Sequence, residues 1–250
     1  MRIAILGMGN MGRAFAARAI ETGHQTTVWN RTPGRVTALV ASGAIEVNTS
    51  TTAAAGADAV LVVLADDAAV LEVCLGDDGV LASLEPDAVF ANVSTVSPAT
   101  SRRLAELGPE GRVLDAPVMG SPQMIAAGSG RFLIGGPTEA IAAIEPLWND
   151  LGSGYTHCGP VGTGATMKIL ANSLLITGVA SLAEVIATAR EQGIPDEFLR
   201  TLLADSPVVS LATNLRLDSL LDATHPGQSL SGSPEPTAGG KGRGSRAKSR

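Results

Sequence analysis

A glycine-rich turn stands directly between an apolar strand and a helix at the start of the chain. Residues 2–6 are almost entirely apolar, and residues 13–20 have the composition of a helix. Between them runs a G-x-G-x-x-G segment made of Gly7, Met8, Gly9, Asn10, Met11 and Gly12. Glycines at these spacings permit a tight turn and a close approach of backbone to a pyrophosphate, while the helix presents free N–H groups to the anion. We therefore predict that these six residues bind a dinucleotide.

The pattern continues as an α/β fold. Short apolar runs alternate with helical patterns over the first 158 residues, which predicts a mostly parallel sheet covered by helices. The expected fold class is a Rossmann-type doubly wound sheet, in a dinucleotide-binding domain over residues 1–160. We expect strands at 2–6, 26–29, 58–64, 88–92, 112–115, 131–135 and 154–158, and helices that include 11–22, 34–42, 97–107 and 137–149.

A different pattern begins after the last expected strand. Residues 164–192 contain no proline and a single internal glycine, which predicts one long helix. Apolar residues cover most of its surface, so we expect it to be buried between two domains or between the two subunits of a homodimer. Residues 196–222 offer one or two further helices, which gives an all-α domain over 161–225. Glycine, serine and basic residues dominate 226–250 and predict a disordered tail.

Composition and charge argue against several classes of function. The net charge is −6, and a negative surface repels nucleic acid and membranes. We find no apolar run close to the roughly 18 residues that span a bilayer, so we expect no membrane segment. Two cysteines, Cys74 and Cys158, cannot form a disulfide framework, and the three histidines are isolated, so no metal site is expected. These features predict a soluble, cytoplasmic protein.

The end of the second expected strand indicates which cofactor is bound. A site that prefers NAD places Asp or Glu there, about twenty residues after the glycines, to hold the ribose 2′-hydroxyl. This chain has Asn30, Arg31 and Thr32 and no acidic residue at that position. Asn30 and Thr32 can form hydrogen bonds with a phosphate, and Arg31 can pair with it as a planar cation. We therefore predict a preference for NADP over NAD.

Lys168 stands near the start of the long helix and is the only lysine in residues 1–240. Asn172 follows four residues later, on the same helical face. Burying a lysine ammonium is costly unless it is paired or used, and desolvation lowers its pKa toward a range useful for proton transfer. A lysine near a helix end can equally extend its ammonium to solvent along an apolar surface. The residues alone do not decide between these two interpretations.

Four segments together resemble the β-hydroxyacid dehydrogenase family, which includes 3-hydroxyisobutyrate dehydrogenase, tartronate semialdehyde reductase and the glyoxylate/succinic semialdehyde reductases. They are the glycine-rich turn, Val-Ser-Thr-Val-Ser-Pro at 93–98, Asp-Ala-Pro-Val-Met-Gly-Ser at 115–121, and the stretch 162–172. The resemblance extends over about residues 1–225. It implies hydride transfer between a nicotinamide cofactor and a small hydroxy acid or semialdehyde.

The resemblance also implies roles for particular residues. Lys168 corresponds to the family's general acid/base, and Asn172 to a residue that holds the substrate. The substrate carboxylate binds the 115–121 loop, largely through backbone N–H groups, so the expected substrate-binding residues are Ser94, Met119, Gly120 and Ser121. Further cofactor contacts are implied for Leu64, Ala65 and Thr95.

This chain departs from the family pattern in two places. The family loop usually reads Ser-Gly-Gly where this chain has Met119, Gly120 and Ser121, which suggests an unusual or less polar substrate. Family members also continue with further helices where this chain enters its low-complexity tail, so we expect a truncated C-terminal domain. Two alternatives follow. One is an imine reductase, although those enzymes generally replace the lysine with Asp or Tyr. The other is a cofactor-binding protein with little or no catalysis.

Overall fold

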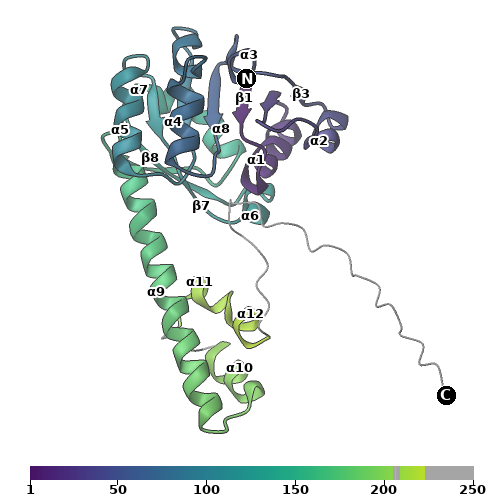
Figure 1. The fold of residues 1–250 in the computed structure, drawn as a ribbon, viewed down its shortest axis with the longest axis vertical. Helices are drawn as coiled ribbons and strands as arrows, with labels where there is room; N and C mark the ends of the chain where they lie inside the picture. Colours follow the sequence, from purple (N-terminus) through teal and green to yellow (C-terminus); the bar gives the residue numbers. More distant parts are fainter. Residues whose placement is uncertain (205, 207–208, 223–250) are drawn as a thin grey trace, which may run out of the picture.

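The first 159 residues form one twisted sheet with helices on both faces, and a long helix leads from it to a small helical bundle (Figure 1). The computed structural model describes residues 1–204, 206 and 209–222, so the expected tail over 226–250 lies outside the described residues. The strands are β1 (Arg2–Leu6), β2 (Gln25–Trp29), β3 (Ile45–Glu46), β4 (Ala59–Val62), β5 (Val89–Asn92), β6 (Val113–Asp115), β7 (Val118–Met119), β8 (Arg131–Gly135) and β9 (Tyr155–Gly159).

The helices alternate with these strands as far as β9. They are α1 (Asn10–Glu21), α2 (Thr37–Ala41), α3 (Ser50–Ala54), α4 (Asp67–Leu75), a 3₁₀ turn η1 (Val80–Ser83), α5 (Pro98–Leu107), α6 (Pro122–Ala126), α7 (Thr138–Ala143) and α8 (Glu145–Asp150). Beyond β9 the described chain is helical: α9 (Thr163–Glu191), α10 (Asp196–Ala204), α11 (Leu211–Asn214) and α12 (Leu217–Leu221).

The sheet order β3-β2-β1-β4-β5-β6-β8-β7 confirms the expected doubly wound α/β fold. Strands β1 to β6 are paired in parallel, β8 runs antiparallel to β6 and β7, and β9 adds to β8 in parallel. Successive residues of a strand point to opposite faces. In β1, Ile3 and Ile5 therefore join the core beneath α1, α7 and α8, whereas Ala4 and Leu6 join the core beneath α3, α4 and α5.

Several boundaries differ from the sequence-based expectation. The expected helix 137–149 is two helices, because Ile144 leaves helical geometry (φ −122°, ψ 27°) immediately before the Pro-containing first turn of α8. The expected helix 34–42 begins only at Thr37, after the positive-φ residue Gly34. Strands β3 and β7 were not expected. Each has two residues, which is too short for an alternation of apolar and polar residues to be recognised.

Helix α9 corresponds to the expected long helix; within one chain it is not buried between two domains, and its expected burial between two subunits stays a prediction. Its first turn packs on β8 and β9, and its last turns pack with α10 and α12 around Leu182 and Ile186. Between these ends α11 packs against one face of the helix, where a Cβ on Gly178 would collide with the Thr213 hydroxyl, and the other faces stand away from the rest of the described chain (Figure 1). Apolar side chains there are exposed, with Leu174 at 78% and Ile176 at 67%. An apolar sequence predicts that a helix needs cover, and among the described residues α11 supplies it on one face only.

The same helix corrects the expectation that no segment is apolar enough to cross a membrane. By length and composition alone Thr163–Glu191 qualifies: it has 29 residues, and an 18-residue window in it has a mean hydropathy of 1.8. Only 11% of that window is buried. Serine, threonine, asparagine and glycine residues interrupt the apolar run while its average stays high, which is why a search for continuous apolar residues misses it. Core helices of soluble proteins satisfy the same length and composition criteria.

Candidate functional site

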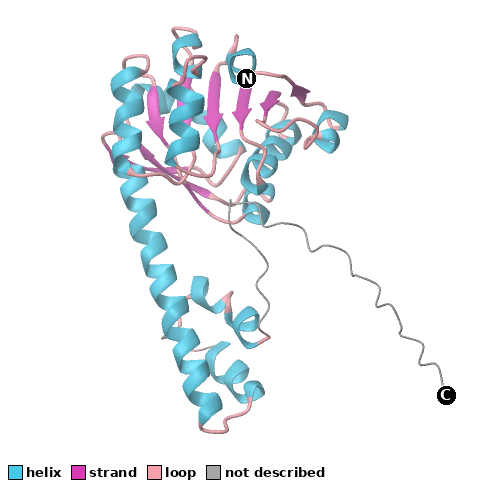
Figure 2. Cartoon of the chain, in the orientation of Figure 1, coloured by secondary structure: helices cyan, strands magenta, loops and turns pink. Residues whose placement is uncertain are grey.

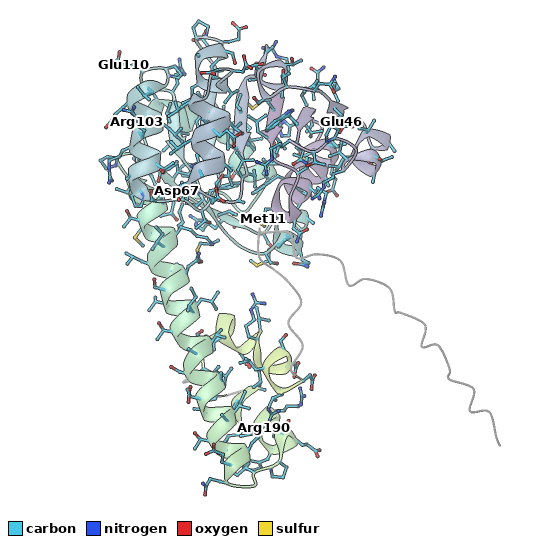
Figure 3. All side chains as sticks on the ribbon, in the orientation of Figure 1. Met11, Glu46, Asp67, Arg103, Glu110 and Arg190 are labelled. Atoms are coloured by element: carbon cyan, nitrogen blue, oxygen red, sulfur yellow. The ribbon has the colours of Figure 1, made fainter. Side chains whose placement is uncertain are left out.

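The predicted site residues meet at one edge of the sheet, where the carboxyl ends of β1, β2, β4, β5 and β6 come together. The strand arrows in Figure 2 point toward this edge, and α9 leaves from it. In Figure 3 the labelled side chains of Met11 and Asp67 lie at this edge, whereas Glu110 lies at the opposite one. Open α/β sheets bind ligands outside the carboxyl ends of their strands. This edge is therefore the candidate site.

The glycine-rich turn has the geometry that dinucleotide binding requires. Gly7 adopts φ +103°, and its N–H donates to the carbonyl of Trp29 over 2.8 Å. A Cβ on Gly12 would collide with the carbonyl oxygen of Gly7, so only glycine lets α1 pack this closely on the turn. A Cβ on Gly9 would meet nothing within 4 Å, so the space beside that residue is open. Helix α1 also lacks a side-chain cap. Open space beside uncapped N–H groups fits a pyrophosphate.

Side chains around the turn hold its shape. The amide of Asn30 accepts the Met8 N–H over 3.0 Å and donates to the Thr32 carbonyl over 2.8 Å. Arg13 donates to the Met8 carbonyl over 3.3 Å and to the side-chain oxygen of Asn10 over 2.8 Å. Asn30 was predicted to bond a phosphate, but its carbonyl and one amide hydrogen are used within the protein. The structural role of Arg13 was not predicted.

The predicted phosphate-binding arginine is available. The Arg31 side chain is 79% exposed, and its nearest ionic partner is Glu72, at 3.9 Å between Nη1 and Oε2. An exposed pair at that distance contributes little to stability. Thr32 is exposed as well, and Arg35, which the sequence reasoning did not single out, lies exposed on the same loop. The loop after β2 therefore carries two accessible guanidinium groups.

The loops after β4 and β5 are joined to each other. The buried Ser94 hydroxyl accepts the Leu64 N–H over 2.9 Å and donates to the Val62 carbonyl over 3.2 Å. Ser94 was predicted to bind substrate, but its hydroxyl is engaged with the neighbouring loop. Ala65 is exposed and Thr95 is half-buried. Both follow strands whose carboxyl ends lie at this edge of the sheet, and their contacts with a cofactor stay a prediction.

The predicted substrate loop has an exposed tip. Met119 is 38% exposed, Gly120 is exposed with φ +157°, and the Ser121 hydroxyl caps α6 by accepting the Met124 N–H over 3.3 Å. The cap occupies one lone pair of that hydroxyl. The groups of the loop that can meet a ligand are therefore the backbone around Gly120, the Met119 side chain and the O–H of the half-buried Ser121.

Lys168 and Asn172 lie one turn apart on α9, and both are half-buried. Burial lowers the pKa of the Lys168 ammonium below the ordinary lysine value. Across the described parts of the chain no carboxylate or carbonyl is hydrogen-bonded or ion-paired to this ammonium. A desolvated lysine without a partner is a candidate for proton transfer.

A buried carboxylate fastens this helix to the sheet. Asp115, the last residue of β6, accepts the Gly162 N–H on Oδ1 over 2.7 Å and the Ala165 N–H on Oδ2 over 2.6 Å. Burial raises the pKa of Asp115, and these N–H donors oppose that rise. Sequence reasoning placed Asp115 only in the substrate loop. The one available hint was a glycine-rich helix start with no capping side chain of its own.

Comparison with known proteins agrees with this geometry. A profile of the NAD binding domain of 6-phosphogluconate dehydrogenase matches residues 2–159. A 3-hydroxyisobutyrate dehydrogenase of Pseudomonas aeruginosa is 34% identical over 215 residues, 85% of this chain and 72% of the relative. An NAD-dependent L-serine dehydrogenase of the same organism is 32% identical over 82% of this chain and 70% of its own length.

Solved structures give the same result for the fold. A 3-hydroxyisobutyrate dehydrogenase from Salmonella typhimurium superposes with a TM-score of 0.82 at 25% identity, covering 92% of this chain and 81% of that one. A reductive aminase from Aspergillus terreus, in complex with NADPH and ethyl levulinate, superposes with a TM-score of 0.68 at 30% identity, covering 81% and 70%. Alcohol-oxidising and imine-reducing enzymes therefore share this architecture.

Proposed function

The chain belongs to the β-hydroxyacid dehydrogenase family of NAD(P)-dependent oxidoreductases, and we propose that it transfers hydride reversibly between NADP(H) and a small β-hydroxy acid or its semialdehyde. The single observation that carries the proposal is Lys168, which is half-buried and unpaired within the described chain, at the sheet edge where the cofactor loops end. A proton donor is required there because reduction of a carbonyl creates an alkoxide.

In this proposal the cofactor supplies or accepts the hydride, and the protein handles the proton. In the direction of reduction, the Lys168 ammonium donates a proton to the carbonyl oxygen as negative charge develops on it. In oxidation the neutral amine accepts the hydroxyl proton. The lowered pKa of Lys168 favours both directions, since it brings the two protonation states closer in free energy near neutral pH. Asn172, on the same helical face, orients the reacting oxygen.

We propose NADP rather than NAD as the preferred cofactor. The loop after β2 has no acidic residue to bond a ribose 2′-hydroxyl, and it exposes Arg31 and Arg35. Guanidinium groups pair with phosphate through parallel hydrogen bonds. The glycine-rich turn and the N-terminus of α1 hold the pyrophosphate, and Leu64, Ala65 and Thr95 line the path toward the nicotinamide.

The substrate we propose carries a carboxylate and has limited polarity elsewhere. The backbone of Gly120 is exposed and offers an N–H to an anion, and Met119 presents a flexible apolar side chain beside it. The Ser121 oxygen caps α6 as an acceptor, so its O–H can still donate, and we assign carboxylate recognition to the backbone around Gly120 together with this O–H.

The test is a panel of substrates followed at the absorbance band of NADPH. Semialdehydes with NADPH and 3-hydroxy acids with NADP+, both with apolar side chains, are expected to be turned over, and the rates are expected to exceed those with NADH and NAD+. Cyclic imines and ketone–amine mixtures form the second arm of the panel, because reductive aminases share the fold. Turnover of imines without turnover of hydroxy acids would overturn the proposal. Binding of NADPH with no turnover of any compound would indicate a cofactor-binding protein.

We further propose that a second copy of the chain covers the exposed part of α9. Large exposed apolar surfaces promote association, and Leu174 and Ile176 present such a surface in the middle of the helix. Sedimentation of the wild-type protein and of Leu174→Glu tests this. The wild type is expected to sediment as a dimer and the variant as a monomer. A wild-type monomer that stays soluble and fully active would contradict it.

A further inference from the structure

We propose that Asp115 is the positioning residue for Lys168, a buried carboxylate that fixes the first turn of α9 to the strand from which the substrate loop begins. The inference rests on the proposed function, in which Lys168 transfers the proton. It assigns to Asp115 no contact with substrate or cofactor. Its effect on the reaction passes entirely through the backbone of α9.

The contact joins parts of the chain that are distant in sequence. The two N–H groups that Asp115 accepts belong to Gly162 and Ala165, 47 and 50 residues farther along the chain. Asp115 is only 1% exposed, so water does not compete for its oxygens. Both bonds are short, at 2.7 and 2.6 Å, as is usual when one partner is charged. A residue of β6 therefore acts as the cap of a helix in the following region.

Helix α9 has no cap of its own. Its N-cap residue, Gly162, has φ +96° and no side chain with which to bond the first N–H groups. The next glycine lets the helix approach the sheet, because a Cβ on Gly164 would collide with the Leu133 carbonyl of β8 and would crowd the Asp115 carbonyl at 2.9 Å. The first turn of α9 is thus held by the Asp115 carboxylate and by close backbone contact with β8.

This attachment links the two sides of the proposed substrate site. Asp115 is the last residue of β6 and the first of the substrate loop, and its backbone is fixed by pairing with Asn92 of β5 and Gly135 of β8. Lys168 follows Ala165 by three residues, about one helical turn. Any displacement of the Ala165 N–H from the carboxylate therefore displaces Lys168 relative to the loop that binds the substrate.

The ionised form of Asp115 is the one that fits. Each oxygen accepts an N–H, and a carboxylate, which carries negative charge on both oxygens, is a stronger acceptor for this pair of donors than a protonated acid. An asparagine at this position keeps one acceptor oxygen but turns its NH₂ group toward the other N–H. Asp115→Asn should therefore preserve the shape of the side chain while releasing one of the two bonds.

The first experiment compares Asp115→Asn with the wild type by three measurements. We expect kcat to fall by about 10- to 100-fold, because a displacement near 1 Å at a reacting group has an effect of that order. We expect the Kd for NADPH, measured by titration without substrate, to stay within about twofold. We also expect the NMR titration midpoint of Lys168 to move toward the ordinary lysine value, because the loosened turn exposes the ammonium. Selective labelling suits this, since the full chain has only two other lysines, Lys241 and Lys248.

Two further variants separate positioning from general loss of structure. Gly164→Ala keeps the carboxylate but displaces the start of α9 from it, because its Cβ would collide with the Leu133 carbonyl and lie 3.0 Å from Asp115 Oδ2. It should reproduce the fall in kcat with NADPH binding retained, and it also serves if Asp115→Asn fails to fold. Trp148→Phe removes a buried hydrogen bond from Nε1 to the Ile141 carbonyl, on α8 and outside the site. It should lower the thermal midpoint and leave kcat unchanged.

Two results would overturn the positioning role. One is a kcat of Asp115→Asn within about twofold of wild type, and the other is a loss of NADPH binding in proportion to kcat. Failure of the proposed function is recognised separately, because the wild-type protein would then turn over no member of the substrate panel. In that case the Lys168 titration decides: a shifted midpoint in Asp115→Asn supports the attachment, and an unchanged midpoint overturns it.

Discussion

The Rossmann region and helix α9 contribute to one site in opposite ways. Every residue of β4 and β5 is buried, and the loops that follow these strands are held by hydrogen bonds to one another. Helix α9 carries the proposed proton donor, but between its ends it is packed only against α11 on one face, and Leu174 and Ile176 are exposed there. Cofactor binding therefore depends on loops that are anchored to a fully buried core. Proton transfer depends on a helix that has much of its surface exposed. The predictions below test that difference.

The largest expected effect is a fall in kcat, caused by substitution of Lys168 in α9. Lys168→Met should lower kcat by about 10²- to 10⁴-fold, the usual contribution of general acid–base assistance, while NADPH binding is retained. Lys168→Arg is the matched control, because it keeps the charge and most of the length but cannot release a proton near neutral pH. It should be as inactive as the methionine variant. Retention of a tenth of the wild-type rate by either one would reduce Lys168 to a packing role.

The next effect compares two leucines that differ in burial. Leu61 of β4 is completely buried, and Leu61→Ala should lower the free energy of unfolding by about 2–5 kcal/mol. Leu174 of α9 is 78% exposed, and Leu174→Ala should change it by less than about 0.5 kcal/mol under conditions where the chain is a monomer. Denaturant unfolding at low protein concentration measures both. Equal losses would show that α9 is covered within a single chain.

The third effect concerns the rim of the Rossmann region. Arg31→Ala should weaken NADPH binding about tenfold and leave NADH binding almost unchanged, because a charged hydrogen bond to the 2′-phosphate is lost. Arg103 of α5, labelled in Figure 3, is a matched control: it is an exposed arginine with a similarly loose ion pair, at 3.8 Å from Glu106. Arg103→Ala should alter neither affinity. Equal losses for NADPH and NADH in Arg31→Ala would mean that Arg31 does not recognise the phosphate.

The smallest expected effect is an increase in thermal stability when Lys168 is replaced by an apolar residue. Burial lowers the pKa of Lys168 in the folded state, so at neutral pH the charged lysine destabilises that state relative to the unfolded one. Lys168→Met should therefore raise the thermal midpoint near pH 7, by about 2–4 °C for each kcal/mol gained. The gain should shrink as pH rises from the folded-state pKa toward the ordinary lysine pKa, where both states lose the charge. A gain in thermal midpoint that does not change with pH would mean that it comes from apolar packing of the methionine and not from removal of the buried charge.

The features that were predicted correctly from the sequence are those formed by residues close together in the chain. The G-x-G-x-x-G segment identifies its turn because spacing alone determines which residues need to be glycine, and Gly7 and Gly12 have the geometry that this requires. What it missed depends on partners far along the chain. Asn30 reaches back 22 residues to Met8, and Asp115 reaches forward to α9. The sequence likewise shows that α9 is apolar but does not show what covers it, so its burial between two subunits stays a prediction.

Hydride transfer itself is the most direct test of the proposed function. NADPH deuterated at the transferring position of nicotinamide C4 would be incubated with a semialdehyde substrate, and the product examined by mass spectrometry. We expect one deuterium on the carbon that bears the new hydroxyl in the wild-type reaction, and almost no product with Lys168→Met. Product without deuterium, or equal labelled product from both proteins, would contradict the assignment of this chain as a dehydrogenase that uses Lys168 for proton transfer.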